Sequence, residues 1–482
     1  MTKCPAPRVR LHALAAVLLA LVASTASAGG PRPNIVHIVA DDLGWKDVGF
    51  NGCEDIRTPN IDALARGGAV LSNFYAQSMC TPTRAALMTG RYPFRYGLQT
   101  AVIPSVSDYG LDTAEWLLPQ ALKRAGYDTA IIGKWHLGHA DKKFWPRQRG
   151  FDYQYGPMIG ELDYFTHSEQ GVLDWFRDNE PVEEEGYTTE LFGDDAVRLI
   201  TNHDTTRPLY LYLAFNAPHT PYQAPQEYID RFPDIQEPTR RIYAGMVSCL
   251  DDQIGRVVAA LEERGMRDNT LIVFHSDNGG THNAMFAGVM ADMSEIKIPC
   301  DNGPFRDGKG SLFEGGSRVC ALANWPGKIE PQSVDGFIHA VDLYTTFATL
   351  AGADTTGGKP LDGVNVWHTI ATNQPSPRNE VVYNIEPFRA AIRRGNWKLI
   401  WRTMLPSSVD LYDLHSDPSE TTNLAAQHPE VVESLQRRIN ELAADAAKPL
   451  FLLDQFKVIL KGMHGEPLMP LDPDYGTMAD QP

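Results

Sequence analysis

The stretch Asn34-Ile-Val-His-Ile-Val-Ala-Asp41-Asp42 contains an apolar run that ends abruptly in two carboxylates. A short, almost continuous apolar run is typical of a β-strand that is buried on both faces. Three further apolar runs end in polar side chains in the same way, within residues 127–138, 208–219 and 269–280. Their polar ends are Lys134 with His136, Asn216 with His219, and Asp277 with Asn278. Four runs of this kind predict four strands of one buried sheet.

Helix-like segments alternate with these runs, at residues 59–65, 114–125, 194–201 and 240–264. Alternation of strands and helices predicts an α/β fold, with a large, mainly parallel sheet sandwiched by helices. In such sheets, ligands bind outside the carboxyl ends of the strands. All four polar ends fall there, so we expect their side chains to converge on one site.

A smaller C-terminal α+β domain is predicted after the composition changes at Thr355. Residues 381–385, 390–401 and 411–414 are expected to form short antiparallel strands, and residues 429–447 a helix. We place the catalytic domain at residues 29–375 and the small domain at residues 376–482. The basic side chains of these strands are interpreted as solvated charges; they are Arg393, Arg394 and Lys398.

Residues 1–28 have the three parts of a secretory signal peptide. Basic side chains come first, an apolar run from Leu11 to Ala23 follows, and Ala26-Ser27-Ala28 forms a cleavage site of small residues. The apolar run is too short to span a bilayer, and no second long one follows. We therefore expect an exported protein, secreted or periplasmic, without a membrane span.

The chain is acidic, with a net charge of −17, so no nucleic-acid partner is expected. An anionic substrate would have to be captured by a local group of cations or by a metal. If Cys80 is reserved for chemistry, four cysteines of the exported chain remain, and export favours one or two disulfides among them. The pairing stays open among Cys53, Cys249, Cys300 and Cys320.

The segment Ser78–Arg91 runs from a Cys-x-Pro-x-Arg motif into a helix-favouring Ala-Ala-Leu-Met run. Pro82 suits the first helical position, which needs no backbone donor. Cys80 would then lie just ahead of a helix N-terminus, where free amides and the helix dipole favour anionic groups. A lone cysteine is more often a half-buried structural residue. The motif therefore gains weight only from the residues that accompany it.

Two pairs of residues with side-chain oxygens lie at the ends of buried strands, Asp41 with Asp42 and Asp277 with Asn278. We call them the acidic pairs, because three of the four are carboxylates, and all four supply hard oxygen ligands. Because no cluster of histidine and cysteine has zinc spacing, one Ca²⁺ or Mg²⁺ is favoured over zinc. Each pair alone could cap a loop as an Asx turn. Two such pairs at two strand ends indicate a metal site instead.

Cationic and imidazole side chains complete the set. Lys134 and His136 alternate with Trp135, so both can face the site while the indole faces away. His219 ends another strand, and glycines on both sides of Lys309 permit close backbone approach to a ligand. Other histidines are interpreted as structural; they are His37, His203 and His275.

Taken together, these motifs resemble the type I, formylglycine-dependent sulfatases of the alkaline phosphatase superfamily, over nearly the whole mature chain. The matching segments are Cys80–Arg84 extended through Arg91, Asp41-Asp42, and residues 133–138, 217–219, 277–280 and 308–310. Within that family the chain looks most like arylsulfatase B, the N-acetylgalactosamine-4-sulfatase branch. That finer likeness lies in residues 96–99, 149–152 and 161–165.

The resemblance implies that a formylglycine-generating enzyme oxidises Cys80, and that the hydrated aldehyde is the nucleophile. It implies that Ca²⁺ touches this hydrate and is held by Asp41, Asp42, Asp277 and Asn278. Arg84 and Lys134 would steady the hydrate, and Lys309 would grip the sulfate. His219 would protonate the departing alcohol and His136 would remove the second hydroxyl proton. The expected substrate contacts are Lys134, His219, Lys309 and Asn216.

The expected substrate is a sulfated saccharide of the N-acetylgalactosamine-4-sulfate type, or an aryl sulfate. Two alternatives stay open: a phosphomonoester, phosphodiester or phosphonate hydrolase on the same scaffold, and a non-catalytic protein that binds sulfated glycans. Residues 281–301 form a longer segment than in the arylsulfatase B branch, and they could be a lid or a packed surface insertion. The sequence leaves the natural sugar, the sulfate position, endo or exo action and the oligomeric state open.

Overall fold

The computed structural model describes residues 1–2, 32–281 and 298–464. The predicted signal peptide, apart from its first two residues, lies outside the described residues. So does most of the segment 281–301 that we interpreted as a lid or an insertion. The predicted boundary between residues 375 and 376 stays a prediction.

The described chain contains a ten-stranded sheet whose centre is parallel. Its five central strands, in spatial order, are β11 (Thr270–Ser276), β1 (Asn34–Ala40), β10 (Leu209–Ala214), β4 (Asp128–Gly133) and β5 (Tyr153–Gly156). Val36 of β1 pairs with Leu211 on one side and with Ile272 on the other. The flanking strands β12 (Ala321–Asn324) and β8 (Phe176–Arg177) are antiparallel to their neighbours in the centre. The predicted mainly parallel sheet is confirmed.

The edges of this sheet are short. Beyond β12 come β2 (Ala69–Leu71) and β13 (Gln332–Val334), and beyond β8 comes β9 (Glu180–Pro181). Short edge strands expose few unpaired backbone groups, which limits edge-to-edge association.

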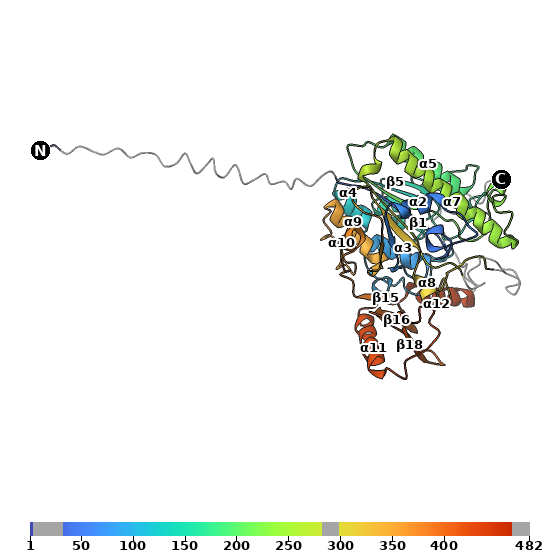
Figure 1. Ribbon diagram of the computed structural model, residues 1–482, viewed down its shortest axis with the longest axis vertical. Helices are drawn as coiled ribbons and strands as arrows, with labels where there is room; N and C mark the ends of the chain where they lie inside the picture. Colours follow the sequence, from blue (N-terminus) through green and yellow to red (C-terminus); the bar gives the residue numbers. More distant parts are fainter. Residues whose placement is uncertain (3–31, 282–297, 465–482) are drawn as a thin grey trace. The chain divides into compact units, whose positions relative to one another are not determined.

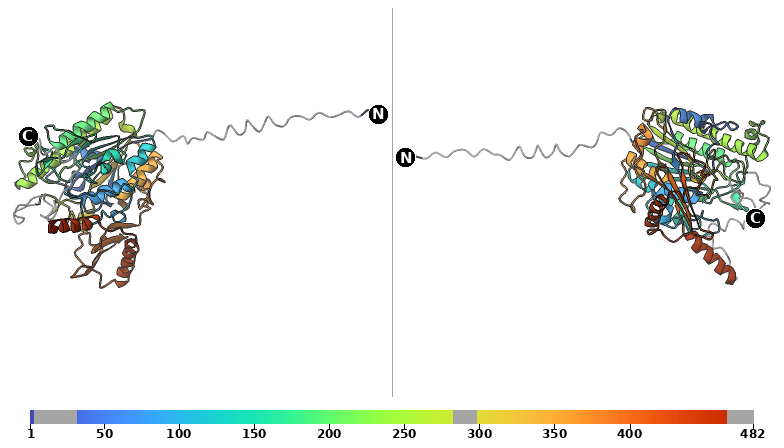
Figure 2. Two further views of the ribbon diagram at one scale, coloured as in Figure 1. Left: turned by 180° about the vertical axis from the view of Figure 1, so that it is seen from behind. Right: turned by 60° about the horizontal axis from the view of Figure 1, so that its bottom comes forward.

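Helices cover both faces of the sheet (Figures 1 and 2). Side chains alternate along a strand, so Val36 and Ile38 of β1 project from one face of the sheet and Ile35 and Val39 project from the other. Each such buried aliphatic side chain contributes roughly 1.5–3 kcal/mol. The first face is covered by α2 (Pro59–Arg66), α5 (Thr188–Asn202) and α7 (Pro238–Glu263). The second is covered by α3 (Cys80–Thr89), α4 (Leu118–Arg124), α9 (Ala340–Ala351) and α10 (Trp367–Thr372).

The four predicted helices are present with shifted ends. α4 begins at Leu118 rather than at the predicted residue 114. At this actual start the Gln120 side chain accepts a hydrogen bond from the Leu117 backbone N–H (2.8 Å) and so caps the first turn. α5 begins at Thr188, one turn and a half before the predicted start. On α7, the side chains predicted to face the core are all buried; they are Leu250, Ile254, Val257 and Leu261.

The C-terminal part forms an antiparallel sheet, as predicted, but with four strands where three segments were expected (Figure 1). Its strands are β15 (Glu380–Ile385), β16 (Arg389–Arg394), β17 (Trp397–Arg402) and β18 (Ser408–Asp413). The predicted run 390–401 is two strands, because the chain turns at Gly395 with a φ of 55°. One face packs on α11 (Pro429–Ala443), and the other packs on Tyr75 and Leu312. A further helix, α12 (Leu450–His464), was not predicted.

The interpretation of the C-terminal strand charges as solvated is wrong for two of three residues. Lys398 is fully buried, and its Nζ lies 3.0 Å from Glu314 Oε1 and 2.8 Å from Glu420 Oε1. Arg393 is 6% exposed, whereas the Arg394 side chain is 45% exposed. Because this sheet packs on both faces, its inward-facing charges are buried against carboxylates of neighbouring segments.

The five cysteines in the described chain all carry free thiols, so the expected disulfides are not formed among them. Cys249 and Cys320 pack inside the apolar cluster on the face that α7 covers. There they act as small hydrophobic side chains. In addition, no helix of the described residues is long and apolar enough to cross a membrane.

Candidate active site

Cys80 is the first residue of α3 and is 1% exposed. The helix begins two residues earlier than predicted, which places Pro82 at its third position. The first four N–H groups of a helix have no partner within the helix, so proline is still tolerated there. The Cys80 Sγ lies 3.5 Å from Asp41 Oδ1. Burial, followed by the charge of Asp41, raises the pKa of this thiol well above its usual value.

The two acidic pairs meet because β1 and β11 are neighbouring parallel strands. Asp41 and Asp42 follow β1, and Asp277 and Asn278 follow β11. The Asp42 backbone N–H donates to Asp277 Oδ1 (3.3 Å), and Asn278 Nδ2 donates to Asp42 Oδ1 (2.7 Å). Asp42 has a φ of 61°, a left-handed conformation that a non-glycine residue adopts only when its surroundings enforce it. One ligand atom from each of four residues lies within 4.8 Å of the others: Asp41, Asp42, Cys80 and His219.

Two buried cations neutralise these carboxylates. Arg84 donates to Asp277 Oδ2 through Nε (3.1 Å) and Nη2 (2.8 Å), and the ammonium of Lys134 donates to Asp41 Oδ2. Arg84 also donates to the Lys134 backbone carbonyl (2.9 Å), which ties α3 to the end of β4. Both basic side chains are fully buried. A buried carboxylate requires such partners, because an unpaired buried charge is strongly destabilising.

Lys309 and His219 approach Asp42 from the cavity side. Lys309 Nζ lies 2.8 Å from Asp42 Oδ2 and 3.0 Å from His219 Nε2. His219 Nδ1 lies 2.7 Å from the Thr220 carbonyl, which can only accept, so Nδ1 carries the proton and Nε2 accepts from Lys309. Burial, followed by the charge of Lys309, lowers the pKa of His219 to about 3. The ring is therefore neutral near pH 7.

His136 is held in a single tautomer. Its Nε2 lies 3.0 Å from the Ile103 carbonyl, so Nε2 carries the proton and Nδ1 is left with a lone pair. Nδ1 is buried, and no hydrogen-bond partner for it exists among the described residues. Burial, followed by the charge of Lys134, lowers the pKa of His136 well below its usual value. The backbone of His136 is also left-handed, with a φ of 56°.

A cavity of about 300 Å³ opens onto these side chains. Four predicted catalytic residues line it, namely Cys80, His136, His219 and Lys309. The rest of the wall comes from Met79, Val102, Ile103, Pro104, Ser105, Gly160, Glu161 and Glu169. Of the strand-end side chains predicted to converge, His136 and His219 line this cavity. Five others are joined by hydrogen bonds to one another or to Lys309 beside it; they are Asp41, Asp42, Lys134, Asp277 and Asn278.

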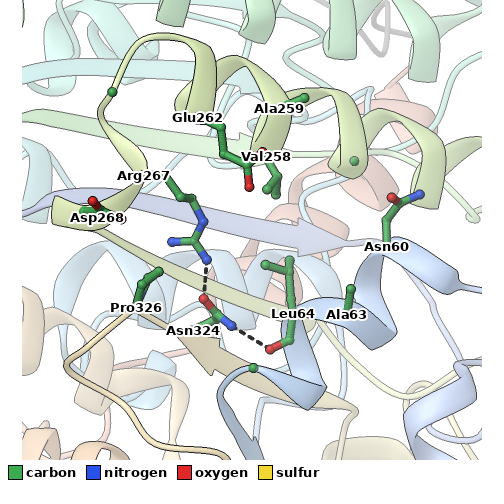
Figure 3. A pocket seen from close by; sticks show the side chains of 13 residues that line it. Asn60, Ala63, Leu64, Val258, Ala259, Glu262, Arg267, Asp268, Asn324 and Pro326 are labelled. Carbon is green, nitrogen blue, oxygen red and sulfur yellow. Dashed lines mark hydrogen bonds between the residues drawn. The ribbon is translucent and has the colours of Figure 1, made fainter.

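A larger cavity, of about 720 Å³, lies elsewhere, between α2 and α7 (Figure 3). Arg267 and Asp268 line it, and they come just before β11, whereas Asp277 follows the other end of that strand. Arg267 donates to Asn324, and Asn324 donates to the Leu64 carbonyl at 2.8 Å. None of the predicted site residues lines this cavity.

One predicted contact residue lies away from the cavity wall. The Asn216 Oδ1 accepts from Thr188 Oγ1 (3.1 Å), and the Asn216 carbonyl accepts from the His219 backbone N–H (3.0 Å). Three residues of the site were missed. Thr281 donates to Asp42 Oδ2 (3.1 Å), while Glu161 and Glu169 line the cavity. Glu161 follows β5, so its place after another parallel strand was the available sequence signal.

The predicted structural histidines lie away from the cavity. The Nε2 atoms of His37 and His275 lie 2.8 Å apart, on the face of the sheet that α9 covers. His203 Nε2 lies 2.8 Å from the Arg207 carbonyl oxygen.

The structure has a helix-covered, mainly parallel sheet that gathers oxygen donors and cations around one residue at a helix N-terminus. This arrangement agrees with the alkaline phosphatase superfamily of hydrolases, which the sequence motifs resemble. The family described as Sulfatase matches residues 33–353, and the family described as N-sulphoglucosamine sulphohydrolase, C-terminal, matches residues 305–445. The chain belongs to the sulfatase family, and it is a sulfuric ester hydrolase.

Relatives extend over most of the chain. Arylsulfatase J of Mus musculus is 32% identical over 471 residues, which cover 86% of this chain and 76% of that protein. N-acetylgalactosamine-6-sulfatase of Homo sapiens is 34% identical over 387 residues, which cover 76% of this chain and 71% of that protein. The crystal structure of Ps i-CgsB in complex with k-i-k-neocarrahexaose has a TM-score of 0.79 at 33% identity, covering 94% of this chain and 100% of that one. The finer likeness to arylsulfatase B stays a prediction.

Proposed function

We propose that this sulfatase removes a sulfate ester from a saccharide, with Cys80 matured to formylglycine and one Ca²⁺ at the acidic pairs. The observation that carries the proposal is the convergence of Cys80, His136, His219 and Lys309 on one cavity of about 300 Å³. That volume is at the small end of ligand pockets, which suits a single sulfated sugar ring.

The donor set fits a hard divalent cation. Asn278 Oδ1 is buried, and no hydrogen-bond partner for it exists among the described residues. Burial, followed by the charge of Asp41, raises the pKa of Asp277 to about 6, which reflects crowding of carboxylates. A cation held by Asp41, Asp42, Asp277 and Asn278 would relieve both features. When bound, it would offset the negative charge of the sulfate oxygens.

The environment of Cys80 disfavours thiolate chemistry. Its thiol pKa is raised by burial and by Asp41, and a neutral thiol is a poor nucleophile. The formylglycine form would supply a hydroxyl oxygen in place of the sulfur. Because residue 80 is 1% exposed, we expect the formylglycine-generating enzyme to act before the chain folds.

The chain's own residues are placed to handle the protons. Nδ1 of His136 has a free lone pair, so this atom can take a proton from a group at residue 80. We assign the proton for the departing alcohol to the pair of Lys309 and His219, because Lys309 Nζ and His219 Nε2 lie 3.0 Å apart at the cavity. The buried cations Arg84 and Lys134 hold the acidic pairs in place.

The saccharide class rests on the relatives. Several curated relatives carry the name N-acetylgalactosamine-6-sulfatase, and Ps i-CgsB binds k-i-k-neocarrahexaose. We therefore propose sulfated N-acetylgalactosamine as the first substrate to test, at either the 4 or the 6 position. The signal-like residues 1–28 support export to the periplasm or the exterior.

The direct test compares hydrolysis of 4-nitrophenyl sulfate with hydrolysis of 4-nitrophenyl phosphate by the mature chain. We expect kcat/KM to favour the sulfate, and Cys80→Ala to abolish turnover without lowering the midpoint of thermal unfolding. Mass spectrometry of the peptide that spans residue 80 should detect formylglycine. A preference for phosphate by orders of magnitude would support the phosphohydrolase alternative. Unmodified Cys80 in a fully active enzyme would overturn the nucleophile assignment.

A further inference from the structure

Glu161 is a carboxylate in the wall of the cavity that receives the sulfate ester. It lies in the segment after β5, next to Gly160, which contacts the ring of His136. The side chain is half-buried, and no hydrogen bond or ion pair to it is found among residues 32–281 and 298–464. Burial is the main cause that raises its pKa, to about 7, with Lys309 acting in the opposite direction.

A second carboxylate, Glu169 of β6 (Ser168–Glu169), lines the same cavity. Burial also raises the pKa of this group, while a hydrogen bond with the Ser105 side chain acts in the opposite direction. Glu161 differs from Glu169 in its position, because it directly follows Gly160, which contacts the ring of His136. The two carboxylates share the wall of this cavity with one cation, Lys309.

Two carboxylates in the wall of a cavity for an anionic substrate are unfavourable for binding that substrate, so their presence needs an explanation. They repel the sulfate, and a half-buried carboxylate without a partner is poorly solvated. A sugar ring supplies what is missing, because its free hydroxyls are hydrogen-bond donors next to the ester. A carboxylate accepts from such hydroxyls strongly. It also disfavours a neighbouring substituent that is itself anionic.

We propose that Glu161 determines substrate specificity: it accepts hydrogen bonds from free hydroxyls of the sugar that carries the scissile sulfate, and it disfavours a second anionic group on that ring. The inference rests on the proposed saccharide substrate. Glu161 would then select substrates at the sugar ring that carries the sulfate. It follows Gly160, which contacts the imidazole of His136. Glu169 adds a second carboxylate to the same wall.

The test compares three substrates at pH 8, where the carboxylate is ionised. They are a monosulfated N-acetylgalactosamine, its 4,6-disulfated counterpart and 4-nitrophenyl sulfate. We expect the unaltered enzyme to prefer the monosulfated sugar. In Glu161→Gln, kcat/KM for that sugar should fall and that for the disulfated sugar should rise, so that their ratio drops by about tenfold or more. The aryl sulfate has no ring hydroxyl, and its turnover should change by less than about twofold.

Two controls make the result specific. Glu190→Gln removes another half-buried carboxylate, on α5 and outside the cavity, and should leave all three substrates unchanged. Glu161→Ser is a second variant that removes the charge, and it should shift the ratio in the same direction as glutamine.

The outcomes that would contradict this proposal can be distinguished from failure of the proposed function. If the unaltered enzyme hydrolyses the sugars and neither Glu161 variant changes the ratio, the specificity role is wrong while the proposed function stands. If aryl sulfate turnover falls in parallel, Glu161 supports the machinery and does not select substrates. If the unaltered enzyme hydrolyses the aryl sulfate but no sulfated sugar, the proposed saccharide function fails first.

Discussion

A β-carbon on Gly160 would lie 2.3 Å from Cε1 of His136 and 2.6 Å from Nε2, so the glycine and the imidazole are in direct contact. No side chain larger than hydrogen fits between this segment and the ring. The absence of a side chain at residue 160 therefore fixes where the His136 ring lies in the cavity.

Gly160→Ala should displace the His136 ring, because its Cε1, Nε2 and Nδ1 atoms are the nearest to the added carbon. A displacement of about 1 Å in a catalytic group can cost about 100-fold in rate, and we expect a loss of kcat of that order on 4-nitrophenyl sulfate. The midpoint of thermal unfolding should change little. Gly357→Ala is the control, because its added carbon would meet its nearest neighbour at an ordinary 3.5 Å. Full activity of Gly160→Ala would show that the ring position is not critical.

Removal of the metal gives a second prediction. Thorough dialysis against a chelator should abolish turnover, and Ca²⁺ should restore it better than Mg²⁺, because Ca²⁺ takes many carboxylate and amide oxygens whereas Mg²⁺ usually keeps several of its waters. Added Ca²⁺ should also raise the midpoint of thermal unfolding, since a ligand that binds only the folded state stabilises it. Asp277→Asn should weaken both responses. Unchanged activity and stability after chelation would contradict the metal site.

The convergence of the acidic pairs was predictable because it follows from topology. Parallel strands of one sheet end at the same edge, so Asp41 and Asp277 were expected on the same side of the sheet. That β1 and β11 are direct neighbours came from the structure. The same reasoning located Lys134 and His219. Their individual roles remain proposals.

Other features depend on packing between distant segments, which periodicity does not report. Lys398 looks like an ordinary strand charge, and its burial follows only from carboxylates that two other segments bring to it. The left-handed backbone of Asp42 and His136 has only a weak signal in residue type, because Asp and His adopt positive φ more often than most residues but do so at few positions. Glu161 lies in an irregular segment, where the sequence gives no direction to the side chain.

Lys398→Met tests the buried ion cluster that joins the C-terminal sheet to Glu314. Removing this ammonium leaves the carboxylates of Glu314 and Glu420 buried without their closest cation. Breaking a buried pair in this way costs roughly 3–5 kcal/mol in the free energy of unfolding. Urea denaturation would measure the change.

Arg394→Met is the matched control, because its side chain is 45% exposed and its pair with Glu380 is at the surface. It should cost less than about 1 kcal/mol. Equal losses in the two variants would contradict the distinction between the buried and the exposed charge.

Acid sensitivity of the fold can be assigned in part to His339, the N-terminal cap of α9. Its ring is fully buried, and its Nδ1 accepts from the Val341 backbone N–H (3.2 Å). Burial, followed by the charge of Arg378, lowers the pKa of His339 well below the 6.5 of a free imidazole. The unfolded chain therefore binds a proton below pH 6.5 that the folded chain does not bind. The free energy of unfolding must then fall as the pH drops through this range.

His339→Asn keeps a good capping side chain but removes the titrating ring. One proton taken up on unfolding corresponds to a slope of about 1.4 kcal/mol per pH unit. Between about pH 6 and pH 5, the slope in the variant should be shallower by up to that amount. Urea midpoints measured across the range would report it, with the same substitution at exposed His415 as the control. An identical slope in His339→Asn and the unaltered protein would mean that the proton is taken up elsewhere, with the buried His37 and His275 pair as the next groups to replace.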